Sequence, residues 1–276
     1  MKNKPKIAFQ GEKAAYSEEA AFQFFGKNIK TISCQTFKEV FKIVEKEKAD
    51  YGIIPVENSL EGSIGQNYDL LLRFNLNVTG EFILRIRHCL IAKKGVRLSE
   101  IKEVYSHPQA LGQCREFLER LKCKMIPCYD TAGSVKIIKE KKSKALAAVA
   151  SQRAASCYGL KVIRQGIETN AHNYTRFFII SKRTTHPSGN DKTSIVFSLK
   201  HRPGALFQAL KVFADQKINL TKIESRPVLG KPWQYNFYVD FEGHGQDKKI
   251  KKTLKSFKKQ VNFLKVIGSY QRAKLK

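Results

Sequence analysis

The sequence has no long hydrophobic run. None of its apolar stretches approaches the roughly 18 uninterrupted apolar residues that a membrane-spanning helix needs. Near the N-terminus the apolar run is too short for the hydrophobic region of a signal peptide, and acidic residues follow it at once. We therefore expect a cytoplasmic protein without a membrane partner.

Cysteine pairs and nucleotide-binding motifs are also missing. The six cysteines contain no CxxC pair, and the closest spacing, Cys123 to Cys128, has no second cluster to complete a zinc site. The chain lacks the GxSxG, P-loop and GxGxxG motifs of serine hydrolases, phosphate-loop enzymes and dinucleotide-binding proteins. We expect reduced cysteines, mainly in the core, and neither a metal nor a cofactor.

Acidic residues are scarce, with 24 Asp and Glu against 51 Lys and Arg, which gives a net charge of +27. Such an excess can indicate nucleic-acid binding. The densest basic cluster, at residues 248–259, nevertheless contains or borders apolar residues at helical spacing: Ile250, Leu254, Phe257 and Val261. Its lysines are therefore predicted to cover the solvent face of an amphipathic helix. Because no nucleic-acid-binding motif accompanies them, we expect no nucleic-acid partner and interpret the charge as a field that attracts small anions.

A polar linker divides the chain into two domains. At residues 181–194, Pro, Gly, Ser, Thr and charged residues replace the apolar periodicity. Residues 1–183 alternate short apolar strands with helices, which predicts an α/β domain with mainly parallel sheets that bind ligands beyond the carboxyl ends of their strands. Residues 192–276 follow the order β-α-β-β-α-β, which predicts a ferredoxin-like sandwich.

Several strands of the first domain have polar residues at their ends. In HNYTRFFII, at residues 172–180, three hydrogen-bonding side chains precede a buried strand: Asn173, Thr175 and Arg176. They either cap the strand against solvent or line a pocket for an anion. Another apolar strand ends in three polar residues, Glu57, Asn58 and Ser59, which are equally typical of a loop and of a binding site.

Three turns lead from strands into helices. At the first, Tyr16 and Ser17 could help free backbone N–H groups to hold a carboxylate, although the pattern alone favours a glycine turn with a capping serine. At the second, a helix cap alone accounts for Ser106, while Gln109 and Gln113 lie one turn apart on one helix face. A weaker candidate for an anion site is the turn at the start of residues 129–138.

Taken in order, these stretches resemble the prephenate dehydratase family over nearly the whole chain. Four of them are similar to the catalytic-domain signatures: QGEKAAYSEEAA, YGIIPVENSLEGSI, SHPQALGQC and NYTRFFII. GALFQAL and ESRP are similar to the two phenylalanine-binding motifs of the ACT regulatory domain. The resemblance implies a two-lobed catalytic domain like a periplasmic binding protein, with a second lobe at about 81–165 and the active site between the lobes, followed by the ACT domain.

The resemblance also implies a reaction, in which prephenate loses CO2 and its ring hydroxyl to give phenylpyruvate for L-phenylalanine biosynthesis. Departing CO2 supplies the electrons, so the leaving hydroxide needs a proton or a hydrogen bond rather than a strong base. We expect the Thr175 hydroxyl to serve that oxygen and Phe177 to pack against the ring. Arg176 is expected to bind a substrate carboxylate or to hold the loop.

Further residues are expected to contact the carboxylates or the hydroxyl of the substrate. These are Asn58 and Ser59, with catalytic roles, and Ser17, Ser106, Gln109 and Gln113. Glu57 is either a buried, protonated acid or an anchor for the residues around it. The expected phenylalanine site comprises Gly204, Ala205, Leu206, Glu224, Ser225, Arg226 and Pro227. ACT domains of this kind pair edge to edge, so we expect a homodimer or homotetramer with L-phenylalanine as its effector.

Two alternatives stay open. NYDLLLR is similar to the branch of the family that includes arogenate dehydratases, whose substrate carries an amine in place of the keto group, and no residue here decides between the substrates. The protein could also be a non-catalytic amino-acid sensor, since both domain types bind small molecules. The intact sequence Thr175-Arg176-Phe177 favours an enzyme.

Overall fold

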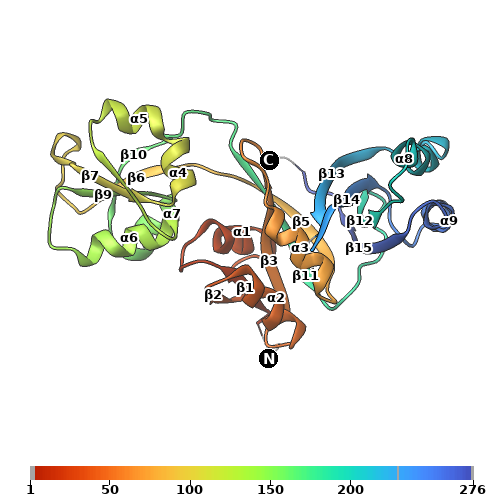
Figure 1. Cartoon of the computed structure of the whole chain (residues 1–276). Helices are drawn as coiled ribbons and strands as arrows, with labels where there is room; N and C mark the ends of the chain where they lie inside the picture. Colours follow the sequence, from red (N-terminus) through yellow and green to blue (C-terminus); the bar gives the residue numbers. More distant parts are fainter. Residues whose placement is uncertain (1–3, 229, 275–276) are drawn as a thin grey trace.

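The computed structural model describes residues 4–228 and 230–274, which form two lobes and a C-terminal domain (Figure 1). The sheet of the first lobe has the order β2 (Lys30–Cys34), β1 (Lys6–Gln10), β3 (Tyr51–Asn58), β11 (Tyr174–Ser181) and β5 (Asn77–Arg85), with the short β4 (Gly62–Ser63) beside β3. Its helices are α1 (Tyr16–Phe25), α2 (Phe37–Glu45) and α3 (Gly65–Arg73). This lobe lies between the second lobe and the C-terminal domain.

The second lobe is built on a sheet of five strands. Their order is β10 (Lys161–Gln165), β6 (Cys89–Ala92), β9 (Leu146–Ala150), β7 (Glu103–Ser106) and β8 (Lys124–Pro127). The helices are the 3-10 turn η1 (Leu98–Glu100), α4 (Pro108–Gln113), α5 (Arg115–Arg120), α6 (Thr131–Glu140) and α7 (Gln152–Tyr158). Local sequence fixes several helix starts: the side chains of Asp130 and Ser151 accept hydrogen bonds from backbone N–H groups in the first turns of α6 and α7.

Both sheets are mixed, so the expectation of mainly parallel sheets was wrong. Strand β1 runs parallel to β2 and β3, whereas β11 runs antiparallel to both of its neighbours. In the second lobe, β7 is parallel to β8 and β9, and β6 is antiparallel to β9 and β10. Two of the antiparallel pairs, β5–β11 and β6–β10, arise because the chain leaves the first lobe along β5 and β6 and returns along β10 and β11, in opposite directions.

The crossing into the second lobe comes later than the expected residue 81. Strand β5 keeps its pairing with β11 as far as Arg85, opposite Tyr174, and the strand that follows begins at Cys89. The connecting segment is therefore residues 86–88. Apolar residues alternate with polar ones through this region without a turn signal, which is why the sequence did not mark the boundary.

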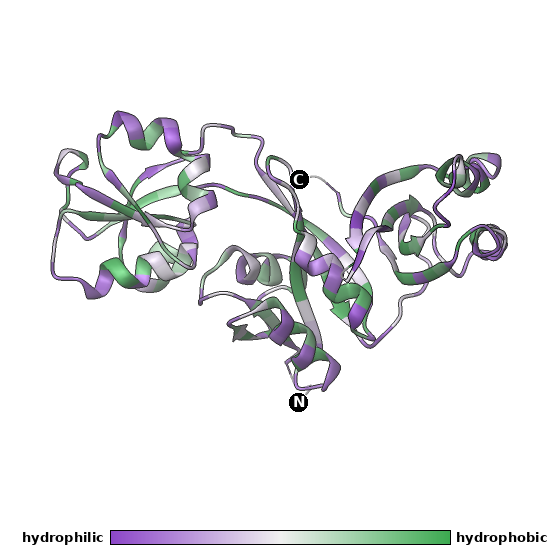
Figure 2. Ribbon diagram, in the orientation of Figure 1, coloured by the Kyte–Doolittle hydropathy of each residue, from purple (hydrophilic) through white to green (hydrophobic). Residues whose placement is uncertain are grey.

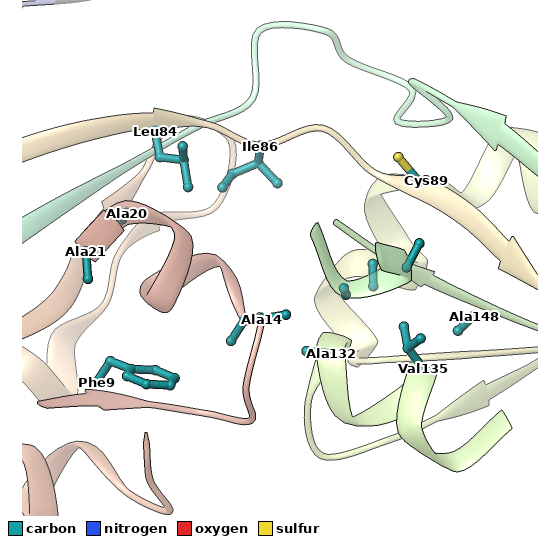
Figure 3. Close-up of a cluster of buried hydrophobic side chains, with 14 of the residues drawn as sticks. Phe9, Ala14, Ala20, Ala21, Leu84, Ile86, Cys89, Ala132, Val135 and Ala148 are labelled. Carbon is teal, nitrogen blue, oxygen red and sulfur yellow. The ribbon is translucent and has the colours of Figure 1, made fainter. Parts of the chain in front are cut away.

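Apolar contacts join the two lobes. One buried cluster contains Phe9 and Ala14 from the first lobe together with Val135 and Ala148 from the second (Figure 3). Ile86, on the connecting segment, belongs to the same cluster. Figure 2 shows that hydrophobic residues follow the central strands, whereas the loops are mainly hydrophilic. The lobes thus share a core, which limits how far they can separate without exposing apolar surface.

The C-terminal domain has the expected ferredoxin-like fold. Its sheet order is β13 (Leu220–Val228), β14 (Lys231–Glu242), β12 (Asp191–Ser198) and β15 (Phe263–Gln271), with helices α8 (Ala205–Asp215) and α9 (Lys248–Lys258). In α9, Ile250 and Phe257 are buried and the lysines are exposed, which confirms the predicted amphipathic helix. No helix in the described ranges is long and apolar enough to span a membrane.

The face of this sheet that α8 and α9 leave uncovered packs against the first lobe. Tyr238 and Tyr270 share a buried cluster with Tyr68 and Phe178 of the first lobe. The ammonium group of Lys265 donates hydrogen bonds to three carbonyl oxygens in the last turn of α3 and just after it, at 2.9–3.0 Å. A lysine at this position also complements the negative end of the helix dipole. The two domains therefore share a continuous interface.

Candidate active site

A cavity of about 380 Å³ lies between the two lobes. Six of the residues expected at the active site line it, from four different elements: Ser17, Asn58, Gln109, Gln113, Thr175 and Phe177. Ser17 is on α1, Asn58 on β3, the two glutamines on α4, and the last two residues on β11. The fold thus brings together residues that are more than a hundred positions apart in the sequence.

Four expected site residues do not line this cavity: Glu57, Ser59, Ser106 and Arg176. Two of them follow the strand rule that neighbouring side chains point to opposite faces of a sheet. Thr175 faces the cavity, so Arg176 points to the other face, where its guanidinium contacts Asp240 and Glu81 at 2.6 and 2.7 Å. Glu57 likewise pairs with Lys222 of the C-terminal domain at 3.2 Å.

The two serines are engaged in local structure. The Ser59 hydroxyl donates to the carbonyl oxygen of His172 at 2.8 Å and accepts from the backbone N–H of Tyr174 at 2.9 Å, which ties the loop after β3 to the start of β11. The Ser106 hydroxyl donates to the carbonyl oxygen of Val149 at 2.6 Å, within the second sheet. Both serines support the strands that carry the site.

Thr175 has a defined neighbour in Asn58. The Asn58 side-chain nitrogen donates to the Thr175 hydroxyl oxygen and to the carbonyl oxygen of Tyr174, both at 3.1 Å. Its side-chain oxygen accepts from the backbone N–H groups of Leu60 and Glu61, at 3.0 and 3.1 Å. The Thr175 oxygen is therefore an acceptor in this contact. No acceptor for its own hydrogen is found among the described residues, so that hydrogen is available to a ligand.

The lining suits an anion with a flat apolar part. No Lys or Arg is among the described residues that line the cavity. Instead, the first residues of α1, α4 and α6 lie at its wall. Helix N-termini attract carboxylates through free backbone N–H groups and the positive end of the helix dipole. The N–H groups of Gln109 in α4 and Gly133 in α6 already donate to the side chains of His107 and Asp130, whereas α1 has no side-chain cap. Phe177 and Ile86 supply an apolar surface beside these donors.

Two lining residues, His88 and Asp130, were not expected. His88 is buried on the connecting segment, where burial lowers the pKa of its ring. Asp130 caps α6, and burial raises the pKa of its carboxyl group. The sequence offered one signal for His88: it is a polar residue directly before the apolar strand β6. Asp130 lies within residues 129–138, the turn that the sequence marked only as a weaker candidate.

The expected effector residues lie in two places within one chain. Gly204 precedes α8 with a φ of +74°, and Ala205 and Leu206 line a hollow of about 700 Å³ that also includes Trp233. None of residues 224–227 lines that hollow. Glu224 and Arg226 turn toward the first lobe, while Ser225 and Pro227 are exposed. A single chain therefore does not bring the two motifs onto one pocket.

Arg226 makes a close contact with the first lobe. Its guanidinium forms two hydrogen bonds with the carboxylate of Asp69, at 3.0 and 3.2 Å. A Cβ atom placed on Gly65 would lie 1.7 Å from this guanidinium, so the glycine makes room for it. The second expected effector motif thus takes part in the domain interface.

Comparisons with known proteins agree with this architecture. A family model described as Prephenate dehydratase matches residues 7–185, and one described as ACT domain matches residues 193–258. A bifunctional chorismate mutase/prephenate dehydratase from Aquifex aeolicus is 42% identical over 278 residues, which cover 100% of this chain and 76% of that protein. Arogenate dehydratase/prephenate dehydratase 2 from Arabidopsis thaliana is 44% identical, over 96% of this chain and 72% of the relative.

A solved structure is similar over the same span. The prephenate dehydratase of Arthrobacter aurescens in complex with L-Phe superposes with a TM-score of 0.89 at 30% identity, and the match covers 97% of this chain and 90% of that one. The family model covers the two lobes that enclose the cavity, and both relatives extend the similarity through the C-terminal domain. The chain belongs to the prephenate dehydratase family and carries an ACT domain at its C-terminus.

Proposed function

We propose that the protein is a prephenate dehydratase of L-phenylalanine biosynthesis, and that the cavity between the lobes is its active site. The observation that carries the proposal is the Thr175 hydroxyl at the cavity, which accepts from Asn58 and has no acceptor for its own hydrogen in the described part of the chain. The family membership supports the same assignment. The related enzymes are named for prephenate or for arogenate, and both substrates have the ring carboxylate and hydroxyl that this chemistry removes.

In the proposed reaction, the bond from the ring to its carboxylate breaks and CO2 leaves. The electron pair completes the aromatic ring while the C–O bond to the ring hydroxyl breaks, and the departing hydroxide takes up a proton to become water. Thr175 donates a hydrogen bond to this leaving oxygen. A threonine is a weak acid in water, so the contribution depends on a positioned donor in a site shielded from solvent.

Binding of the dianion relies on neutral donors. Gln109 and Gln113 line the cavity, as does the start of α1, which has no side-chain cap; their amide groups and its N-terminus can bind carboxylates without a lysine or arginine. Phe177, fully buried beside Thr175, offers a surface for the ring. The net charge of +27 adds a field that attracts anions to the protein as a whole.

Arogenate is the second candidate substrate, and Asp130 is the observation that favours it. Arogenate carries an ammonium group where prephenate has a keto oxygen. A carboxylate in the cavity wall attracts an ammonium group and repels a keto oxygen. The side chain of Asp130 already accepts a hydrogen bond from the N–H of Gly133 at 2.7 Å, so only part of its charge is available.

The experiment is a pair of assays on purified protein, with prephenate in one and arogenate in the other, following phenylpyruvate and phenylalanine. We expect turnover of prephenate with the higher kcat/KM. Thr175→Ala should lower kcat by about 10²–10⁴-fold, the usual contribution of a positioned proton donor, and Thr175→Ser should retain part of the activity. Both variants should keep the wild-type circular dichroism spectrum.

Other outcomes would revise the proposal. Preference for arogenate would make the protein an arogenate dehydratase, and wild-type kcat in Thr175→Ala would remove the role given to Thr175. No turnover of either substrate, together with binding of phenylalanine, would instead support a non-catalytic sensor.

We further propose that L-phenylalanine is an effector that binds where two ACT domains meet, in a homodimer or homotetramer. Exposed aromatic side chains support a second copy at this surface: Trp233 is 80% exposed beside the hollow and Phe207 is 66% exposed on α8. Because Trp233 is the sole tryptophan of the chain, its fluorescence can report the event. Phenylalanine should change this fluorescence and inhibit turnover, and light scattering should show at least a dimer.

A further inference from the structure

A continuous chain of hydrogen bonds runs along the cavity to Thr175. Its members, in order, are Tyr16, His88, Gln113, Asn173, Asn58 and Thr175. Each link is 2.8–3.1 Å long. The chain begins on α1, passes through the segment that connects the lobes, enters α4 of the second lobe and returns to β3 and β11 of the first. The first three of the five links, from Tyr16 through His88 and Gln113 to Asn173, join the two lobes, and the last two lie in the first lobe.

The backbone fixes the direction of this chain. Asn58 receives two backbone N–H groups at its oxygen, and a backbone N–H can only donate. Its nitrogen must therefore donate to the side-chain oxygen of Asn173, at 2.8 Å. The nitrogen of Asn173 then donates to the Oε1 atom of Gln113, also at 2.8 Å. Exchanging the side-chain oxygen and nitrogen of Asn173 or of Gln113 would place two donors or two acceptors against each other.

The same direction determines the hydrogen on the imidazole of His88. The Oε1 atom of Gln113 can only accept, so the Nε2 atom of His88, 2.9 Å away, must carry a hydrogen. Because the buried ring favours its neutral form, the Nδ1 atom is bare and accepts from the hydroxyl of Tyr16 at 3.0 Å. The carbonyl oxygen of Arg87 lies 2.7 Å from the same hydroxyl and competes for its hydrogen.

We propose that His88 is a positioning residue for the dehydration: its Nε2–H orients the amide of Gln113, and through Asn173 it holds in place the Asn58 nitrogen that donates to the Thr175 hydroxyl oxygen. This inference rests on the proposed function. With Oε1 of Gln113 held by His88 and Asn173, the NH2 group of Gln113 is directed to the cavity as a second donor. The imidazole itself does not need to touch the substrate.

The test compares two amide substitutions of His88 that differ only in reach. In His88→Gln, the longer side chain can place an N–H near the Nε2 position and keep the donor to Gln113. In His88→Asn, the amide reaches only as far as the Nδ1 position, so the hydrogen bond to Gln113 is lost although the substituted side chain is again an amide. We expect His88→Gln to keep a kcat close to wild type and His88→Asn to lower kcat about tenfold or more, since small misplacements of reacting groups have effects of this size.

A double-mutant cycle separates this role from a merely structural one. If His88 acts on kcat through Thr175, His88→Asn should have almost no further effect on kcat in the Thr175→Ala background. KM should rise in both backgrounds, because Gln113 loses its orientation in both. An equal fall in kcat in the two backgrounds, or wild-type kcat in His88→Asn, would overturn the inference.

Asn173→Asp provides a second variant in case His88→Asn does not fold, as judged by circular dichroism. It keeps an oxygen for Asn58 and replaces the donor to Gln113 with another acceptor. We expect a loss of kcat similar to that of His88→Asn, and a wild-type kcat would overturn the inference. If the wild-type protein turns over neither substrate, the proposed function is refuted. If the wild type is active and His88→Asn and Asn173→Asp have wild-type kcat, only the role of His88 is refuted.

Discussion

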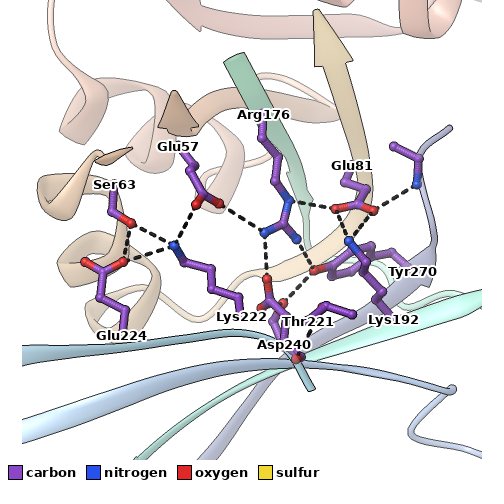
Figure 4. A network of polar contacts seen from close by, with 12 residues as sticks. Glu57, Ser63, Glu81, Arg176, Lys192, Thr221, Lys222, Glu224, Asp240 and Tyr270 are labelled. Atoms are coloured by element: carbon purple, nitrogen blue, oxygen red, sulfur yellow. Dashed lines mark hydrogen bonds and ion pairs between the residues drawn. The ribbon is translucent and has the colours of Figure 1, made fainter. Parts of the chain in front are cut away.

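Replacing Arg176 with methionine tests how strongly the two domains are held together. Its guanidinium lies in the domain interface, with Nε 2.7 Å from Glu81, one Nη atom 2.6 Å from Asp240 and the other 3.1 Å from the hydroxyl of Tyr270 (Figure 4). The side chains of both acids are almost fully buried, at 0% and 4% exposure. Methionine keeps much of the apolar stem and removes the charge.

The expected loss of stability in Arg176→Met depends on which carboxylate loses its cationic partner. Glu81 retains Lys192, whose ammonium group is 3.1 Å away. Asp240 retains only a hydrogen bond from the Ser194 hydroxyl at 2.5 Å and has no other cation among its contacts in the described ranges. Removing one partner of a buried ion pair costs about 3–5 kcal/mol. At about 2–4 °C per kcal/mol for a protein of this size, the melting temperature should fall by roughly 6–20 °C.

Thermal and urea denaturation provide the measurements, followed by circular dichroism for the whole chain and by Trp233 fluorescence for the C-terminal domain. Lys211→Met is the control, because it removes an exposed ion pair with Asp215 and should change stability by about 1 kcal/mol at most. Adding Asp240→Asn to the Arg176 variant should recover part of the loss, since no buried charge then lacks a partner.

One result would refute this reasoning. If Arg176→Met denatured at the same urea concentration as Lys211→Met, the buried network would contribute no more than a surface pair. Asp240 would then have to be neutral, or hydrated, in the folded protein.

Two further predictions concern single positions. Gly268→Ala should weaken the domain interface, because its Cβ would lie 2.1 Å from the carbonyl oxygen of Val78, whereas Gly112→Ala, in α4 with open space around it, should be neutral or stabilising; urea midpoints measure both. The Asp130→Asn variant should become more stable relative to wild type as the pH rises from 4 to 7. Burial raises the pKa of Asp130 in the folded state, so the wild-type protein loses folding free energy as the pH rises through that pKa. Asparagine does not titrate and keeps the helix cap. Equal differences in the urea midpoints at the two pH values would contradict this reasoning.

Local pattern was enough to predict most elements of the fold. Apolar runs between turn residues gave the strands, and capping residues marked helices such as α6 and α7. The order of strands and helices in residues 192–276 gave the ferredoxin-like fold directly. What local pattern could not give was the direction of the strands in each sheet, because that depends on how the chain passes between the lobes.

The candidate site was predictable only in part. Asn58, Gln113 and Thr175 stand in the motifs that carry the family resemblance, and all three line the cavity. The alternation of strand side chains already implied that Thr175 and Arg176 diverge. The sequence could not show what the second face contacts, since Asp240 is 64 positions away along the chain. His88 needed the three-dimensional chain of hydrogen bonds to be recognised.

The alternation also places the cavity and the domain interface one residue apart along the strands. On β11, Thr175 faces the cavity and Arg176 faces the ACT domain; on β3, Asn58 and Glu57 divide in the same way. Thr175 pairs with Asn58 across the two strands, as Arg176 does with Glu57. Any shift of the ACT sheet that pulls on Arg176 or Glu57 would therefore displace the strand segments that hold Thr175 and Asn58. Because coupling between two sites is reciprocal, an effector that changes substrate affinity would have its own affinity changed by the same factor when the cavity is occupied.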